Sequence, residues 1–96
     1  MNNSAIKQII SSAKSEIQYR FKADVRGIFG SCARGDMTES SDVDILVHFH
    51  DGATLIELSG LAMYLTERIG RPVDIVSDRA IREEISSTVL NELVSV

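Results

Sequence analysis

Residues 29–49, FGSCARGDMTESSDVDILVHF, connect two predicted strands through a polar loop. The first strand, 25–29, is rich in β-favouring residues and ends at a glycine. The second strand, 43–49, is mostly apolar and is followed by an Asp-Gly turn signal. Asp42 and Asp44 stand at its start, and residues two apart in a strand point to the same face. Two carboxylates therefore project together from a segment whose other face must be buried.

The segments around these strands carry helical spacing. Apolar residues recur every three or four positions over 4–21 and again over 54–69, where a glycine and then a proline follow as stop signals. A short third strand is predicted at 73–76 and a last helix over 77–93. The order helix, strand, turn or short helix, strand, helix, strand, helix predicts an α/β fold, with helices packed on a small mixed sheet. We expect a single domain over 1–96.

Composition limits the classes of function. The 96-residue chain is 44% hydrophobic and 25% charged, as in soluble globular proteins. Its apolar runs are too short for a membrane span, so no membrane association is expected. The net charge of −4 and the few aromatic residues argue against stable binding of nucleic acid. The start of the chain lacks the layout of a secretory signal, and Cys32 is its one cysteine, so a cytoplasmic location is expected.

A third carboxylate, Asp74, lies in the short apolar strand PVDIV, where a charge is costly without a partner. If this strand lies beside the strand that begins near Asp42 and Asp44, the three carboxylates form an all-oxygen cluster. Such a cluster suits Mg²⁺, or Mn²⁺ as the alternative, and can hold two ions about 4 Å apart for phosphoryl transfer. A lone Asp-x-Asp is more often a turn or helix cap. His48 and His50 are interpreted as partly exposed structural histidines.

The loop before Asp42 has the features of a phosphate-binding turn. Gly30 allows a sharp turn after the first strand, and the free N–H groups of a first helical turn can bind phosphate. Ser31 adds a hydroxyl donor and Arg34 a guanidinium group. The predicted phosphate and metal sites thus come from adjacent segments, as a nucleoside triphosphate with its metal requires.

Four motifs together resemble a known signature: Gly30-Ser31, then Ala33-Arg34-Gly35, then Ser41-Asp42-Val43-Asp44, and later Val73-Asp74-Ile75-Val76. This pattern is similar to that of the DNA polymerase β-like nucleotidyltransferase superfamily, in its minimal nucleotidyltransferase (MNT) branch. The resemblance covers nearly the whole chain and keeps the spacing of all three aspartates.

The resemblance implies roles for the matching residues. Asp42 and Asp44 would ligate two Mg²⁺ ions, and Asp74 would ligate the catalytic ion and align or deprotonate the attacking hydroxyl. Gly30 and Ser31 would bind the triphosphate of ATP. Arg34 and Ser41 would assist in cofactor binding.

Many members of the MNT branch are encoded beside a HEPN-domain toxin and are its antitoxin. By this resemblance the chain is expected to transfer AMP from ATP to a tyrosine hydroxyl of a HEPN partner, in a hetero-oligomer. Two alternatives stay open: an antitoxin that neutralises its toxin by binding alone, and a nucleotidyltransferase that acts on a small molecule. The size of the chain favours a protein acceptor, because it leaves no room for a domain that grips the acceptor.

Overall fold

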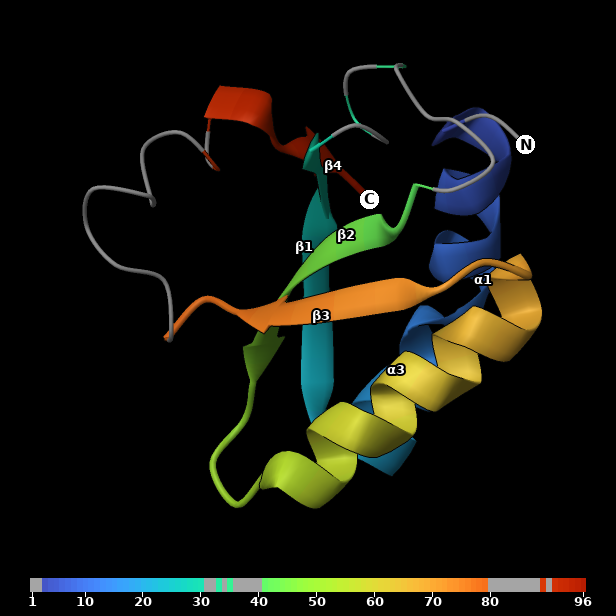
Figure 1. Cartoon of the computed structure of the whole chain (residues 1–96). Helices are drawn as coiled ribbons and strands as arrows, with labels where there is room; N and C mark the ends of the chain where they lie inside the picture. Colours follow the sequence, from blue (N-terminus) through green and yellow to red (C-terminus); the bar gives the residue numbers. More distant parts are fainter. Residues whose placement is uncertain (1–2, 31–32, 34, 36–40, 80–88, 90) are drawn as a thin grey trace.

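The computed structural model describes residues 3–30, 33, 35, 41–79, 89 and 91–96. The elements in chain order are α1 (Asn3–Phe21), β1 (Ala23–Phe29), β2 (Val43–Phe49), α3 (Leu55–Ile69), β3 (Val73–Ser77) and β4 (Val94–Ser95). The predicted α/β fold with helices packed on a small mixed sheet is confirmed (Figure 1). Among the described helices, none combines the length and hydropathy that crossing a bilayer would require.

The strands form a mixed four-stranded sheet in the order β3-β2-β1-β4. β1 runs antiparallel to β2 and to β4, whereas β2 and β3 are parallel. Parallel neighbours need a long crossover, and α3 supplies it between β2 and β3. The residues that start β2 and β3 therefore lie at the same end of the sheet.

The caps of α3 follow directly from the sequence. Thr54 accepts a hydrogen bond from the backbone N–H of Ile56, and the Glu57 side chain accepts one from the backbone N–H of Thr54, forming a capping box. Gly70 ends the helix with φ of 80°, a left-handed conformation that costs glycine little. Thr66 then accepts a hydrogen bond from the backbone N–H of Val73 at 3.2 Å, which ties the start of β3 to α3.

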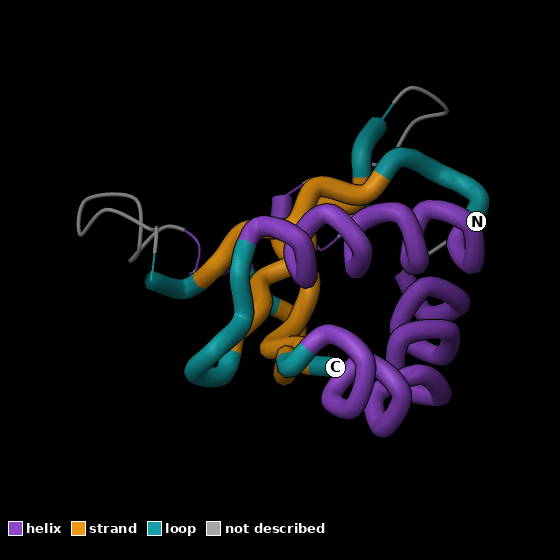
Figure 2. The backbone as a smooth tube through the Cα atoms, turned by 90° about the horizontal axis from the view of Figure 1, so that it is seen from below, coloured by secondary structure: helices purple, strands orange, loops and turns teal. Residues whose placement is uncertain are grey.

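One face of the sheet packs against both helices (Figures 1 and 2). The core contains Ile6, Ile10, Ala13, Ile17 and Phe21 of α1, Leu61, Leu65 and Ile69 of α3, and the inward residues Val43, Ile45, Val47 and Phe49 of β2. The other face of β2 carries Asp44, Leu46 and His48. This separation leaves the carboxylate face of the sheet away from the helices.

Several boundaries differ from the sequence-based predictions. α1 begins at Asn3, one residue earlier than predicted. β1 begins at Ala23, earlier than predicted, and β3 extends to Ser77. Most of the predicted last helix lies outside the described residues, although Val89, Asn91 and Glu92 are helical.

Strand β4 was not predicted at all. It is only two residues long, and its pairing with Gly27 and Ile28 is what defines it. A Cβ atom on Gly27 would clash with the carbonyl oxygen of Val94, so the glycine lets the two backbones approach. Lys14 of α1 donates a hydrogen bond to the carbonyl of Val96, which holds the end of the chain against the first helix.

Candidate functional site

The register of β2 and β3 brings the predicted carboxylates to one edge of the sheet. Asp44 pairs directly with Asp74 across the two parallel strands, so their side chains leave the same face. Asp42 lies two residues before Asp44, immediately before β2, and is exposed. Asp44 is half-buried and Asp74 is exposed. The expected proximity of the Asp42 and Asp74 segments is confirmed.

The backbone around these carboxylates is fixed by contacts between the two strands. Val43 donates a backbone hydrogen bond to the carbonyl of Pro72 at 2.9 Å, and its side chain is fully buried. Val43 also pairs in register with Val73. Because each valine lies directly beside an aspartate in the chain, burial of the valines determines where Asp44 and Asp74 emerge.

Gly30 makes room for the carboxylate of Asp44. It has φ of 70°, which glycine adopts with little strain. A Cβ atom at this position would collide with Oδ2 of Asp44 and would lie 3.4 Å from its Cγ. Phe29, the preceding residue, pairs with Asp44 across β1 and β2. The end of β1 is thus shaped around this carboxylate, and a side chain at position 30 would displace the Asp44 oxygen.

The donor set fits a hard divalent cation. All three side chains offer carboxylate oxygens, which Mg²⁺ and Mn²⁺ prefer, and Gly30 leaves space around one of them. Within the described part of the chain, no three His, Cys, Asp or Glu side chains are already grouped so that they could hold a metal ion. The backbone therefore places the donors, and binding an ion would require their side chains to turn toward one another.

Only some of the predicted phosphate-binding residues lie within the described part of the chain. Gly30 lies beside Asp44 as described above, and Ala33, between the remaining loop candidates, is helical. Ser41 is half-buried and comes just before Asp42. Ser31 and Arg34 lie outside the described residues.

A second polar cluster occupies the far end of the same sheet face, and the sequence did not reveal its pairings. Asp24 accepts a hydrogen bond from Gln18 at 2.6 Å and lies 2.6 Å from Nε2 of His50. His48 places Nδ1 3.0 Å from Asp78. Each histidine thus has a carboxylate partner, and both are partly exposed as predicted, while their purely structural role stays a prediction.

The environment of Asp24 shifts its titration. The hydrogen bond with His50, followed by that from Gln18, lowers the pKa of the Asp24 carboxyl below its usual 3.8. Partial burial opposes this shift, and the positive charge of Arg26 adds to it. The cluster therefore stabilises the ionised carboxylate, and it joins β1 to α1 and to the segment after β2.

Comparisons with known proteins agree with this geometry. The family model for the nucleotidyltransferase domain matches residues 6–96. The protein adenylyltransferase MntA of Thermococcus cleftensis is 40% identical over 91 residues, covering 95% of this chain and 92% of the relative.

Two solved structures share the fold. One, described as a minimal nucleotidyltransferase, superposes with a TM-score of 0.84 at 33% identity, covering 100% of this chain and 97% of that one. A toxin–antitoxin structure with AMP-PNP has a TM-score of 0.71 at 23% identity, covering 99% of this chain and 72% of that one. With the family match and the paired aspartates, these findings show that the chain belongs to the nucleotidyltransferase domain family, as one of its minimal nucleotidyltransferases.

Proposed function

We propose that this chain is a protein adenylyltransferase that transfers AMP from ATP to a hydroxyl, specifically a tyrosine, of a partner HEPN toxin, and is thereby its antitoxin. The proposal rests on the strand register, which pairs Asp44 with Asp74. Asp42 lies two residues before Asp44. The activity named for the 40%-identical relative, protein adenylyltransferase, supports the choice of a protein acceptor. The fold shared with a toxin–antitoxin structure containing AMP-PNP is consistent with ATP and with a toxin partner.

In the proposed reaction, the acceptor oxygen attacks the α-phosphorus of ATP. A new oxygen–phosphorus bond forms as the bond between the α-phosphorus and its bridging oxygen to the β-phosphate breaks, and pyrophosphate leaves. Asp74 aligns the hydroxyl and accepts its proton. Asp42 and Asp44 would hold two Mg²⁺ ions, which supply charge neutralisation of the triphosphate when bound. Gly30 and Ser31 would receive the triphosphate.

Loop residues complete the proposed binding of ATP. Arg34 and Ser41 would contribute a guanidinium and a hydroxyl donor. Positioning and charge neutralisation provide most of the catalysis in reactions of this type, because the protein does little covalent chemistry itself. The half-buried position of Asp44 against Gly30 supports a pre-positioned carboxylate.

The test is the intact mass of the proposed HEPN-domain partner after incubation with the chain, ATP and Mg²⁺. We expect a mass increase by whole AMP units. Asp42→Asn should abolish it, whereas Asp51→Asn should not. Asp51 is exposed and lies beyond the other end of β2, so its variant removes the same charge outside the site. An unchanged partner mass, in a complex that forms and silences the toxin, would instead establish neutralisation by binding alone.

A small-molecule acceptor is tested in the same experiment. Pyrophosphate release that requires the partner protein supports a protein acceptor. Release of pyrophosphate from ATP at the same rate with a small hydroxyl compound as the acceptor, without any partner, would contradict the proposal.

A further inference from the structure

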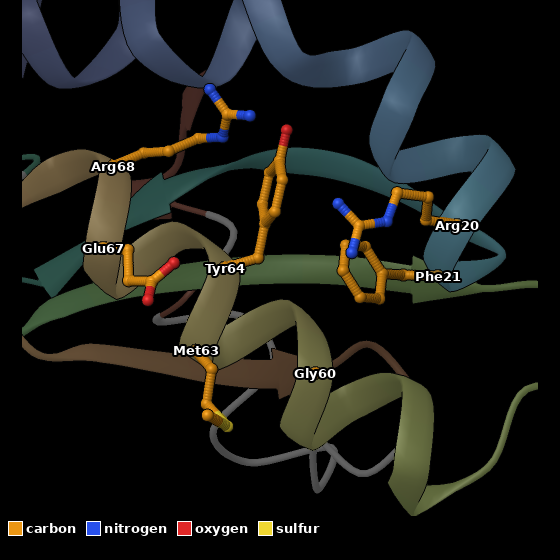
Figure 3. A pocket seen from close by; sticks show the side chains of 7 residues that line it. All are labelled: Arg20, Phe21, Gly60, Met63, Tyr64, Glu67 and Arg68. Carbon is orange, nitrogen blue, oxygen red and sulfur yellow. The ribbon is translucent and has the colours of Figure 1, made fainter.

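A hollow lies between α1 and α3, on the side of the sheet opposite the carboxylates. Its volume is about 440 Å³, and it is lined by Arg20, Phe21, Gly60, Met63, Tyr64, Glu67 and Arg68 (Figure 3). Tyr64 and Phe21 form its aromatic wall, with ring centroids 5.3 Å apart. Gly60 keeps it open, since even a Cβ there would lie 3.0 Å from the Phe21 ring. We call the surface formed by these seven residues the α1–α3 hollow.

Met63 forms a ridge beside this hollow. The Met63 side chain is 71% exposed. It also borders a second hollow of about 280 Å³, whose other lining residues are Ala62, Thr66 and Glu67. Ile56, two helical turns earlier, is also 81% exposed and on the same stripe. A side-chain ridge between two grooves is the shape that a second helix packs against. Exposed apolar side chains gathered in this way mark an interaction site.

Two arginines place cationic groups around the ring of Tyr64. Figure 3 shows the ring standing between them, with the Cζ atoms of Arg68 and Arg20 lying 4.3 and 5.4 Å from its centroid. Both guanidinium groups approach the same carboxylate, Glu16, at 3.7 and 3.6 Å, which is longer than a hydrogen bond. One carboxylate cannot neutralise both groups, so positive charge and N–H donors face outward at this rim.

The stacking holds the guanidinium planes in position. Tyr64 is itself held by a hydrogen bond that its hydroxyl donates to Glu16 at 3.0 Å. Arginine stacked on an aromatic ring is pre-organised to bind a carboxylate through two parallel hydrogen bonds. Glu67, next to Arg68 on α3, adds a carboxylate to the lining of the hollow. The surface therefore combines two cationic groups, an apolar centre and one carboxylate.

From these contacts we propose that the α1–α3 hollow is the docking site for an amphipathic helix of the partner protein. The helix inserts an apolar side chain beside Met63 and sets a carboxylate against Arg20 and Arg68. Tyrosine, phenylalanine, methionine and arginine are enriched at protein interfaces, and they dominate this surface. The surface lies across the sheet from the three aspartates, so docking and chemistry are separate.

This inference rests on the proposed function for the identity of the partner, and the experiment separates the two. The probe is the purified HEPN-domain partner of the proposed function, titrated calorimetrically against wild type and Met63→Glu. We expect at least tenfold weaker binding for the variant, with an unchanged melting temperature because the site is exposed and glutamate favours helix. In AMP transfer, Met63→Glu should raise KM for the partner protein and leave kcat at saturation unchanged.

Leu55→Glu is the matched control. Leu55 is 77% exposed on the same helix, and its variant adds the same charge outside the hollow. It should bind the partner as wild type does, whereas Arg68→Gln should weaken binding and reduce its dependence on salt. Equal weakening by Leu55→Glu would overturn the inference, because the hollow would then have no special role.

Two further outcomes are distinguishable. If wild type transfers AMP and Met63→Glu binds the partner equally well, the docking site is refuted and the proposed function stands. If wild type binds the partner without AMP transfer and Met63→Glu weakens that binding, the docking site stands and the proposed function fails. A chain that dimerises alone, becomes monomeric with Met63→Glu and keeps its affinity for the partner would assign the surface to self-association and refute the inference.

Discussion

Replacing Gly30 with alanine tests whether the end of β1 positions the carboxylate of Asp44. The new Cβ would collide with Oδ2 of Asp44 and would lie 3.4 and 3.7 Å from its Cγ and Cβ. To reach an ordinary contact of about 3.5 Å, the oxygen must move by roughly 1 Å, most easily by rotation of the side chain. Misplacement of this size in an active site can lower the rate on the order of 10²-fold.

Gly70→Ala is the control that separates strain from contact. Gly70 has φ of 80° and Gly30 has φ of 70°, so alanine is strained by a similar amount at both positions, about 1–2 kcal/mol. A Cβ on Gly70 meets no atom within 4 Å, whereas one on Gly30 meets Asp44. The two variants should therefore lose similar free energy of unfolding and differ in activity.

The assay combines urea unfolding with AMP transfer to the partner, followed by intact mass. We expect both variants to be destabilised by about 1–2 kcal/mol and transfer to fall on the order of 10²-fold only in Gly30→Ala. Stabilisation by Mg²⁺-ATP, measured as a melting-temperature shift, should also be smaller in Gly30→Ala. Wild-type transfer by Gly30→Ala would refute the reasoning, and an equal loss in Gly70→Ala would attribute the effect to stability alone.

Two further predictions concern stability. Because the pKa of Asp24 is lowered in the folded state, its hydrogen bonds with His50 and Gln18 stabilise the protein above the usual value of 3.8, and this contribution is lost as pH falls through the folded value. Asp24→Asn should therefore lower the melting temperature at pH 6, and this deficit should shrink as the pH is taken progressively below 3.8; a deficit that does not change with pH would show that charge is not involved. Thr54→Ala should reduce the free energy of unfolding by about 1 kcal/mol in urea titrations, because the capping box of α3 is lost. Ser59→Ala, at an exposed site inside the same helix, should change it by under about 0.5 kcal/mol, and a deficit matching that of Thr54→Ala would contradict the capping argument.

Local sequence patterns explain which elements could be predicted from the sequence. The bounds of β2 were predicted as observed, because alternating buried residues and a following turn mark it within one short segment. The terminal Gly70 was also visible, since the end of a helix depends on residues a few positions apart, whereas Thr54, predicted inside the helix, is its N-cap. The β4 strand was missed because two residues carry no periodic pattern, and only contact with β1 defines them.

The sequence by itself determined α1, α3, the main strands and the three candidate carboxylates, because each depends on residue types and spacing within one segment. Only the tertiary structure decided that Asp44 faces Asp74 and that Gly30 leaves space for the first of them. The same is true of the carboxylate partners of the two histidines and of the α1–α3 hollow. These features join residues far apart in the chain, so they depend on strand register and helix packing. Burial of the whole core sets both, and no single segment carries that information.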